Sequence, residues 1–180
     1  SDALTFIEDC SQNPDYREVI KKIGDEKIRK KEDQELVLRF FALKNDIEHY
    51  KFPVAEYLTN YLEGITTQEK PFDYIKEKEI FDKTFKIINL NLGDSAFSSI
   101  TKAKNIKNDF VTYLFDGISI AIANLVDRIA VDKKNVKIEE KVYDIKIGSE
   151  LQSYKTGTMS SLNKRIELFK EGVENVIDER

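Results

Sequence analysis

The sequence predicts an all-α fold, an irregular multi-helix bundle of about seven to eight helices around two central apolar helices at residues 33–47 and 108–131. Residues that start or end helices recur along the chain, apolar residues repeat at helical spacing, and no segment reads as a confident hairpin or repeat. Hydrophobic residues make up 41% of the chain and charged residues 34%, which is typical of a globular helical protein rather than a disordered one. The 180 residues are expected to form a single helical domain.

In the first half of the chain, a few residues mark the expected helix boundaries. Asn13 precedes a proline at the first helical position, and the helix that starts there is expected to end at Gly24. Asp33 is expected to cap the first central helix. A further helix is expected to open at Pro53 and to close at Gly64.

The second half of the chain is expected to hold four longer helices. One follows Pro71 and stops at Gly93, and Asn108 is expected to cap the second central helix. The last two are expected at about 134–148 and about 161–177. The segment VYDIKI within the third of these alternates like a strand, but its apolar residues also share one helical face, and we favour a helix.

The two central helices are apolar on most of their faces, and such helices are buried on most sides. Arg39 interrupts the first, and Glu35 lies one turn earlier in the favourable acid-then-base order. We therefore expect a buried ion pair between Arg39 and Glu35. Gly117 costs the second helix about 1 kcal/mol of helix propensity. A closely packed neighbouring helix would explain this glycine.

Charge and cysteine content restrict the possible functions. The net charge of −4 gives no global field that would hold nucleic acid, so any DNA contact must come from a local basic patch. Cys10 is the only cysteine, which suits a reducing compartment, and we expect a cytoplasmic location. No apolar run reaches membrane-spanning length, so no membrane partner is expected. The chain begins with Ser1 rather than methionine and is interpreted as a piece of a longer protein.

Three basic groups are candidates for DNA or phosphate contact. They are Lys27, Arg29, Lys30 and Lys31; Lys102, Lys104 and Lys107; and Lys155, Lys164 and Arg165. Residues 15–35 hold seven basic and seven acidic side chains, which favours a solvated connection for the first group. The second group is less mixed and lies on a predicted loop, where simple solvation is the alternative.

The third basic group belongs to the segment YKTGTMSSLNKR, residues 154–165. Backbone N–H groups around Gly157 and at the start of the last helix could hold a phosphate. The simpler interpretation is a joint between two helices, in which Gly157 ends one helix in a left-handed conformation and Ser160 or Ser161 caps the next. We favour the joint, because the full phosphate-loop pattern is absent from the sequence.

Reactive residues are scarce. His49 is the only histidine, and a polar histidine near a helix end is favoured over a general base or metal ligand. Asp144 and Lys146 resemble half of a restriction-nuclease arrangement, in which acids bind magnesium and a lysine assists the attacking water. That chemistry requires a strand that points both side chains to one face, whereas the local period favours a helix.

The segment RKKEDQELVLRFFAL, residues 29–43, resembles a signature of the "domain of unknown function 262" family. In this family a basic, acid-containing turn leads into an E-L-V-L-R-F-F-A-like run, which residues Glu35 to Phe41 match. Segments 57–62, 108–125 and 156–177 also resemble family segments in the expected order. The resemblance therefore covers most of the chain.

The resemblance implies a two-part parent protein of the restriction or phage-defence type. Its N-terminal part would resemble a ParB/sulfiredoxin fold with a D-G-Q-Q-R motif tied to nucleotides, and some members carry an HNH-type nuclease domain. Neither motif is present in this sequence, which is similar to the helical C-terminal part alone. The resemblance therefore implies no catalytic residue, metal or cofactor in this segment, and an N-terminal domain of the parent chain as its partner.

Three functions remain open from the sequence. The first is a non-catalytic helical module that supports the N-terminal domain and helps to hold DNA. The second is a protein-interaction or homo-oligomerisation module without a DNA role. The third is a magnesium-dependent nuclease that uses Asp144 and Lys146. Whether the parent protein is an enzyme is left open at this point.

Overall fold

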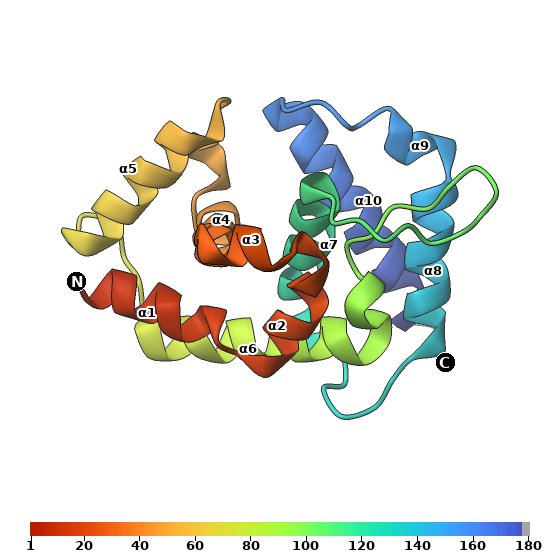
Figure 1. Ribbon diagram of the computed structural model, residues 1–180, viewed down its shortest axis with the longest axis horizontal. Coiled ribbons are helices and arrows are strands. Elements are labelled where there is room, and N and C mark those ends of the chain that lie inside the picture. The colour runs from red at the N-terminus through yellow and green to blue at the C-terminus, as the bar shows by residue number, and fades with distance from the viewer. Residues whose placement is uncertain (178–180) are drawn as a thin grey trace.

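The computed structural model describes residues 1–177 and shows a bundle of helices (Figure 1). Within this range there are ten α-helices, eight of them of seven residues or longer, and no strand, so the expected fold class is confirmed. The longer helices are α1 (Asp2–Ser11), α2 (Pro14–Ile20), α4 (Glu32–Asn45), α5 (Val54–Thr66), α6 (Tyr74–Leu92), α7 (Thr112–Asn124), α8 (Val136–Ile147) and α10 (Met159–Ile177). The shorter ones are α3 (Asp25–Arg29) and α9 (Ser149–Gln152).

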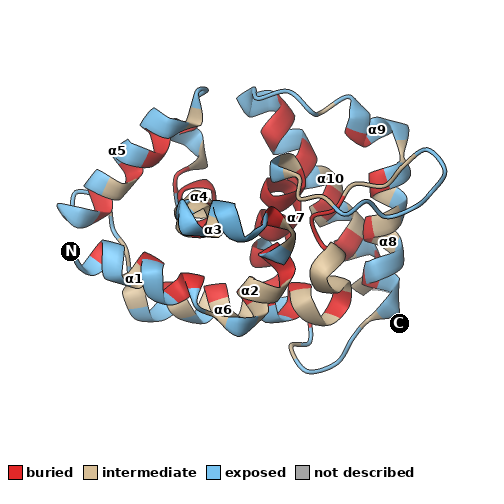
Figure 2. Ribbon diagram, viewed as in Figure 1, coloured by how far each residue is buried: buried red, intermediate tan, exposed pale blue. Residues whose placement is uncertain are grey.

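Helices α4 and α7 lie at the centre of the bundle, as predicted (Figure 1). Every residue of α7 from Leu114 to Ala123 is buried, and α7 packs against α4, α6 and α10 (Figure 2). Helix α4 buries the continuous run from Phe40 to Leu43. These two helices therefore supply much of the apolar core, as expected for helices that are apolar on most sides.

Aromatic side chains fill the space between α2, α4 and α6. The ring centroids of Phe81 and Phe85 lie 4.6 Å apart, and the ring of Tyr16 meets that of Phe85 edge-on at 4.9 Å. Phe40 and Phe41 pack against each other at 5.1 Å and against the same cluster. Such pairs each contribute about 0.5–1.5 kcal/mol beyond their burial. The helical spacing of these aromatic residues in the sequence therefore reflects core packing.

Several predicted helix ends are confirmed. The Asn13 side chain accepts a hydrogen bond from the backbone N–H of Tyr16 at 3.0 Å, so it caps α2. Gly24 ends the 3₁₀ turn that follows α2, with a φ of +89°, and Gly93 ends α6 with a φ of +61°. Residues with a Cβ rarely adopt such values, which explains glycine at both positions.

Two predicted boundaries in the first half are wrong. Asp33 does not cap α4, which begins at Glu32; it lies buried in the first turn, where its carboxylate is 2.8 Å from Nη1 of Arg17. Gly64 does not close α5, which continues to Thr66. A Cβ at Gly64 would lie 2.6 Å from Cδ of Lys70, so this glycine makes room for a side chain instead.

The second central helix is shorter than expected. It begins at Thr112 rather than at Asn108, because residues 108–111 belong to a loop. Gly117 meets the predicted close neighbour, since a Cβ there would lie 3.0 Å from Cδ2 of Phe169 in α10. The segment 142–147 lies within α8, which confirms the preference for a helix over a strand. Among residues 1–177 no helix has the length and apolar character that crossing a bilayer requires.

Candidate functional site

The loop between α6 and α7 forms one wall of the candidate site (Figure 1, green). It folds back on itself, because Ile100 and Ile106 pair across it in an isolated antiparallel bridge. The residues between them form the exposed tip, which carries Lys102 and Lys104, and the exposed Lys107 follows directly. The second basic group of the sequence is therefore gathered at one end of a single loop.

This loop is fixed at its base and at its tip. The carboxylate of Asp109 accepts hydrogen bonds from the backbone N–H and the hydroxyl of Ser99, at 2.8 and 2.5 Å. At the tip, the hydroxyl of Tyr143 in α8 donates to the carbonyl oxygen of Lys104 at 2.8 Å. These contacts hold the lysines of the loop in a defined place above α8.

Lys146 of α8 anchors the start of the loop. Its Nζ donates to the carbonyl oxygens of Ser95, Ala96 and Ser98, at 3.1, 2.8 and 2.9 Å. An ammonium group has three N–H bonds, one for each carbonyl. Burial lowers the pKa of Lys146 to about 7, against a smaller opposing effect of the Asp109 charge. Lys146 is thus a buried structural side chain beneath the loop.

The geometry of α8 is unsuited to the nuclease arrangement. Asp144 and Lys146 are two residues apart on a helix, which points their side chains in nearly opposite directions. Asp144 is exposed, whereas Lys146 is buried and its amine is occupied by the three carbonyls. The strand that would bring both side chains to one face is not formed here.

The turn between α9 and α10 forms the opposite wall, and its carbonyl groups are held from behind. Nη1 of Arg165 donates to the carbonyl oxygen of Tyr154 and, at 2.9 Å, to that of Thr156. The hydroxyl of Tyr50 donates to the carbonyl oxygen of Gly157 at 3.0 Å. The carbonyl groups of the turn are therefore held by cationic and hydroxyl donors from the core.

The segment connects two helices, as favoured from the sequence, but the roles predicted for Gly157 and for the capping serine are wrong. Gly157 does not adopt a left-handed conformation; a Cβ there would lie 2.9 Å from Cδ2 of Phe52, which explains the glycine. The cap of α10 is Thr158 rather than Ser160 or Ser161, because its hydroxyl accepts from the backbone N–H of Ser161 at 3.1 Å.

The loop, α8, α9 and the turn border an open pocket of about 730 Å³, which we call the lysine pocket. Beside the buried Lys146, its lining includes four further lysines from two separate segments: Lys102, Lys104, Lys107 and Lys155. All four are exposed, and no carboxylate belongs to the lining residues. Lys107 lies 3.9 Å from the Asp109 carboxylate, and no ion pair of the other three is found among the described residues. The pocket therefore concentrates positive charge on a protein of net charge −4.

Tyr113, in the first turn of α7, forms an aromatic wall of the lysine pocket. The amine of Lys155 lies 5.3 Å from its ring centroid, and the guanidinium carbon of Arg165 lies 6.0 Å from it. Both distances fit cation–π contacts. Sequence reasoning missed Tyr113; the available signal was an aromatic residue shortly after a basic loop.

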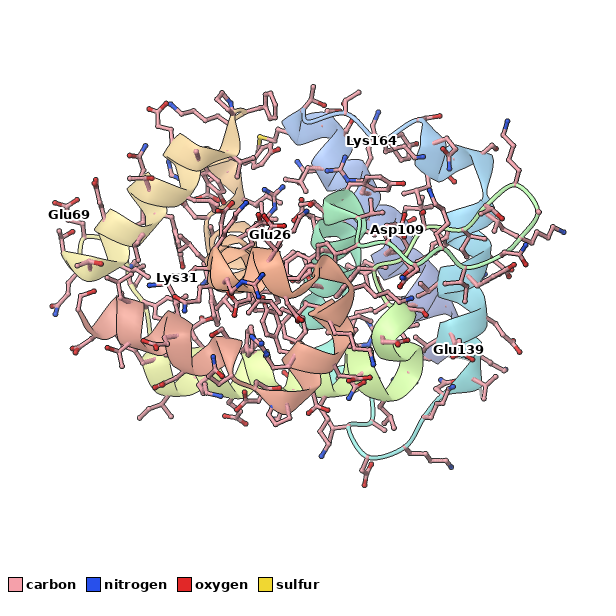
Figure 3. The ribbon with its side chains drawn as sticks, in the orientation of Figure 1. Glu26, Lys31, Glu69, Asp109, Glu139 and Lys164 are labelled. Atoms are coloured by element: carbon pink, nitrogen blue, oxygen red, sulfur yellow. The ribbon has the colours of Figure 1, made fainter. Side chains whose placement is uncertain are left out.

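The remaining basic candidates lie elsewhere. Lys27, Arg29, Lys30 and Lys31 belong to α3 and the turn after it, where Lys30 pairs with Glu26 at 3.0 Å and Lys27 with Glu32 at 3.9 Å. Figure 3 shows Lys31 and Glu26 on the α3–α4 side of the bundle, away from Asp109 and Lys164. The mixed charges support a solvated connection.

Two members of the third basic group do not line the lysine pocket. Lys164 is exposed on α10, with its amine 5.5 Å from the ring centroid of Tyr154. Arg165 is only 3% exposed, and Nη1 of its guanidinium donates to two backbone carbonyls. Arg165 therefore supports the turn from inside, and the phosphate contact expected of it stays a prediction.

Arg39 forms a buried ion pair as expected, but with a different partner. Its Nε and Nη2 donate to the two carboxylate oxygens of Asp116, both at 2.6 Å, which joins α4 to α7. Burial alone would lower the pKa of Arg39, and the hydrogen bonds and charge of Asp116 raise it above its ordinary value. The expected pairing with Glu35 is wrong, because Glu35 points to solvent.

His49 lies in a 3₁₀ turn just after α4 and is exposed. Its Nδ1 is 2.5 Å from a carboxylate oxygen of Asp46, whose other oxygen is 3.0 Å from the amine of Lys70. Burial raises the pKa of Asp46, but the hydrogen bonds from His49 and Lys70 outweigh it and lower the pKa. Asp46, Glu48 and His49 are close enough to share a cation, but Lys70 already neutralises the central carboxylate. This cluster fits a local ion-pair network.

Comparisons with known proteins found no relative of this chain. No protein-family model matches the sequence, and neither the comparison with curated proteins nor that with solved structures returned a match.

Proposed function

We propose that this chain is a helical module that contacts nucleic acid through the lysine pocket. The observation that carries the proposal is the convergence of Lys102, Lys104, Lys107 and Lys155 on one cavity without a lining carboxylate. Phosphate groups are bound by such clusters of lysines, and the interaction is independent of base sequence. Lys146 and Arg165 support the two walls of the pocket from inside the protein.

The resemblance of residues 29–43 to the "domain of unknown function 262" family suggests the setting of this module. Residues Glu35 to Phe41 form the middle of α4, a central helix, and four of them are buried in the core. We propose that the parent protein is of the restriction or phage-defence type. In that protein the module supports an N-terminal domain and helps it to hold DNA.

The proposal is tested by measuring DNA affinity as a function of salt. Fluorescence anisotropy with a labelled 12-nucleotide DNA, single-stranded and as a duplex, gives the dissociation constant between 50 and 200 mM salt. The charge-reversal variant K102E/K104E/K155E removes three of the four exposed lysines of the pocket. We expect it to lose at least about 100-fold in affinity at low salt, because attraction to phosphate becomes repulsion.

The matched control is K27E/K30E/K31E, which makes the same change in net charge at the α3 cluster. It should change affinity by about threefold or less, because long-range effects of exposed charges are screened within about 10 Å at this ionic strength. Equal losses in the two variants would show that net charge, and not the pocket, sets the affinity. The proposal would then fail.

A protein-interaction or oligomerisation module is the second candidate, and exposed apolar side chains favour it. Leu4 of α1 is 54% exposed, Ile75 of α6 is 84% exposed and Phe52 is 72% exposed. Sedimentation velocity at about 5 to 500 μM protein separates the candidates. A concentration-dependent dimer together with no DNA binding would support the second candidate over the first.

A further inference from the structure

We infer that the lysine pocket takes single-stranded nucleic acid, with one base stacked on Tyr113. This inference rests on the proposed function and specifies its ligand. Three features of the pocket lead to it: its concave shape, the apolar part of its lining, and the placement of Tyr113 between cations.

The shape of the pocket selects against a duplex. Its volume of about 730 Å³ lies in the range of sites that enclose small ligands, about 300–1,000 Å³. A duplex carries its phosphates on a wide convex surface and keeps its bases paired inside, so it can contact the exposed lysines but cannot bring a base into the pocket. One nucleotide of a single strand is small enough to enter.

The lining of the pocket suits both halves of a nucleotide. The exposed lysines offer amines to the phosphates, whereas Ile100, Val111, Ile147 and Tyr113 provide apolar and aromatic surface for a base. Proteins that bind single strands combine these two features, a basic groove and aromatic side chains on which bases stack. The stacking is tolerant of sequence, because every base has a π-face.

Tyr113 is placed for stacking. The exposed Lys155 lies over the ring and has no ion pair among residues 1–177, so a base can take its place while its amine contacts a phosphate. The buried Arg165 stays over the ring, because backbone carbonyls hold Nη1 of its guanidinium. The Tyr113 hydroxyl makes no hydrogen bond within the described part of the chain, so the ring is the functional part of this side chain.

The first test compares ligands and ring variants by fluorescence anisotropy. We expect the wild type to bind labelled dT12 at least about tenfold more tightly than a 12-base-pair duplex. Y113L should weaken dT12 binding by about 5- to 150-fold, since base stacking contributes about 1–3 kcal/mol. Y113F keeps the ring and should bind within about twofold of the wild type. The dissociation constant of U12 is measured beside that of dT12. The oligonucleotide that binds more tightly shows whether the pocket prefers RNA or DNA.

The second test reports stacking directly. A 2-aminopurine base in the middle of the dT12 strand loses fluorescence when it stacks on an aromatic ring, so binding to the wild type and to Y113F should quench it. Y113L, checked for folding by circular dichroism and thermal melting, should not. Duplex binding as tight as single-strand binding, or unchanged binding by Y113L, would overturn this inference and leave the proposed function standing. Absence of binding to both DNA forms and to U12 would defeat the proposed function itself.

Discussion

The ion pair between Arg39 and Asp116 is the internal contact whose removal should most change the stability of the protein. The Asp116 side chain is 1% exposed and that of Arg39 is 14% exposed, so both charges are largely withdrawn from water. Arg39→Met would leave a carboxylate with no cation at 2.6 Å in the middle of α7. Breaking a buried pair by removing one partner costs about 3–5 kcal/mol, because the remaining charge stays buried and uncompensated.

The cost should be visible in both chemical and thermal unfolding. Urea titration followed by circular dichroism gives the free energy of unfolding, which we expect to fall by about 3–5 kcal/mol in Arg39→Met. For a chain of this length, each 1 kcal/mol lowers Tm by about 2–4 °C, so a decrease of about 10 °C is expected. The same variant should also weaken dT12 binding, because Asp116 lies one turn after Tyr113 on α7.

A double-mutant cycle separates the pair from general damage to the core. The double variant Arg39→Met/Asp116→Leu removes both charges and should cost about 1 kcal/mol or less, far below the sum of the single changes. Glu35→Gln is the control for the local pairing expected from the sequence, and it should change stability by less than about 0.5 kcal/mol because Glu35 is exposed. A loss below 1 kcal/mol in Arg39→Met, or additive costs in the double variant, would refute the reasoning.

Two further predictions concern Lys146 and Gly117. The pKa of Lys146 is about 7 in the folded chain, against an ordinary value of 10.5. Between pH 7 and pH 10.5 the unfolded chain therefore binds this proton more tightly than the folded chain does. The free energy of unfolding should rise with pH over this range. Urea titrations of the wild type and Lys146→Met should show the wild type gaining relative stability from pH 7 toward pH 10, and a constant difference would contradict the pKa. Gly117→Ala should lower stability by about 1 kcal/mol, because its Cβ would lie 3.0 Å from Phe169 and overpacking outweighs the better helix propensity. A raised Tm in thermal melting would show that Phe169 moves aside freely.

Local signals in the sequence predicted many of the helix ends. Asn13 and Gly24 act through their own backbone and the next few residues, so their roles are visible in a short segment. Asp33 and Gly64 are residue types that also favour helix ends, but the cap predicted at Asp33 and the helix end predicted at Gly64 are wrong. In both cases a residue from a different segment decides the outcome, Arg17 for the first and Lys70 for the second.

The ion pair of Arg39 shows the same limit more clearly. Sequence spacing reveals partners one helical turn away, and Glu35 fits that spacing. The actual partner, Asp116, is 77 positions away and is brought near only when α4 packs against α7. A charged residue on an otherwise apolar helix predicts a buried partner, but the identity of that partner depends on the tertiary fold.

The candidate site was only partly accessible from the sequence. Lys102, Lys104 and Lys107 were recognisable as a basic loop, but their meeting with Lys155 depends on how the loop folds over α8 and how the last turn is held. Arg165 looked like a phosphate ligand because it follows a glycine turn and a lysine. Its burial, which assigns it to the support of that turn, follows from the packing of α10 against α7.

The affinity for single-stranded dT12 between 50 and 200 mM salt tests the central claim most directly, in the wild type and in K102E/K104E/K155E. With up to four lysines on phosphates, the logarithm of the wild-type binding constant should fall with a slope of about −2.8 against the logarithm of the salt concentration, a loss of about 50-fold over this range. The variant should bind at least about 100-fold more weakly at the lowest salt concentration. Wild-type binding that is absent or independent of salt, or a variant that binds as tightly as the wild type, would contradict the account.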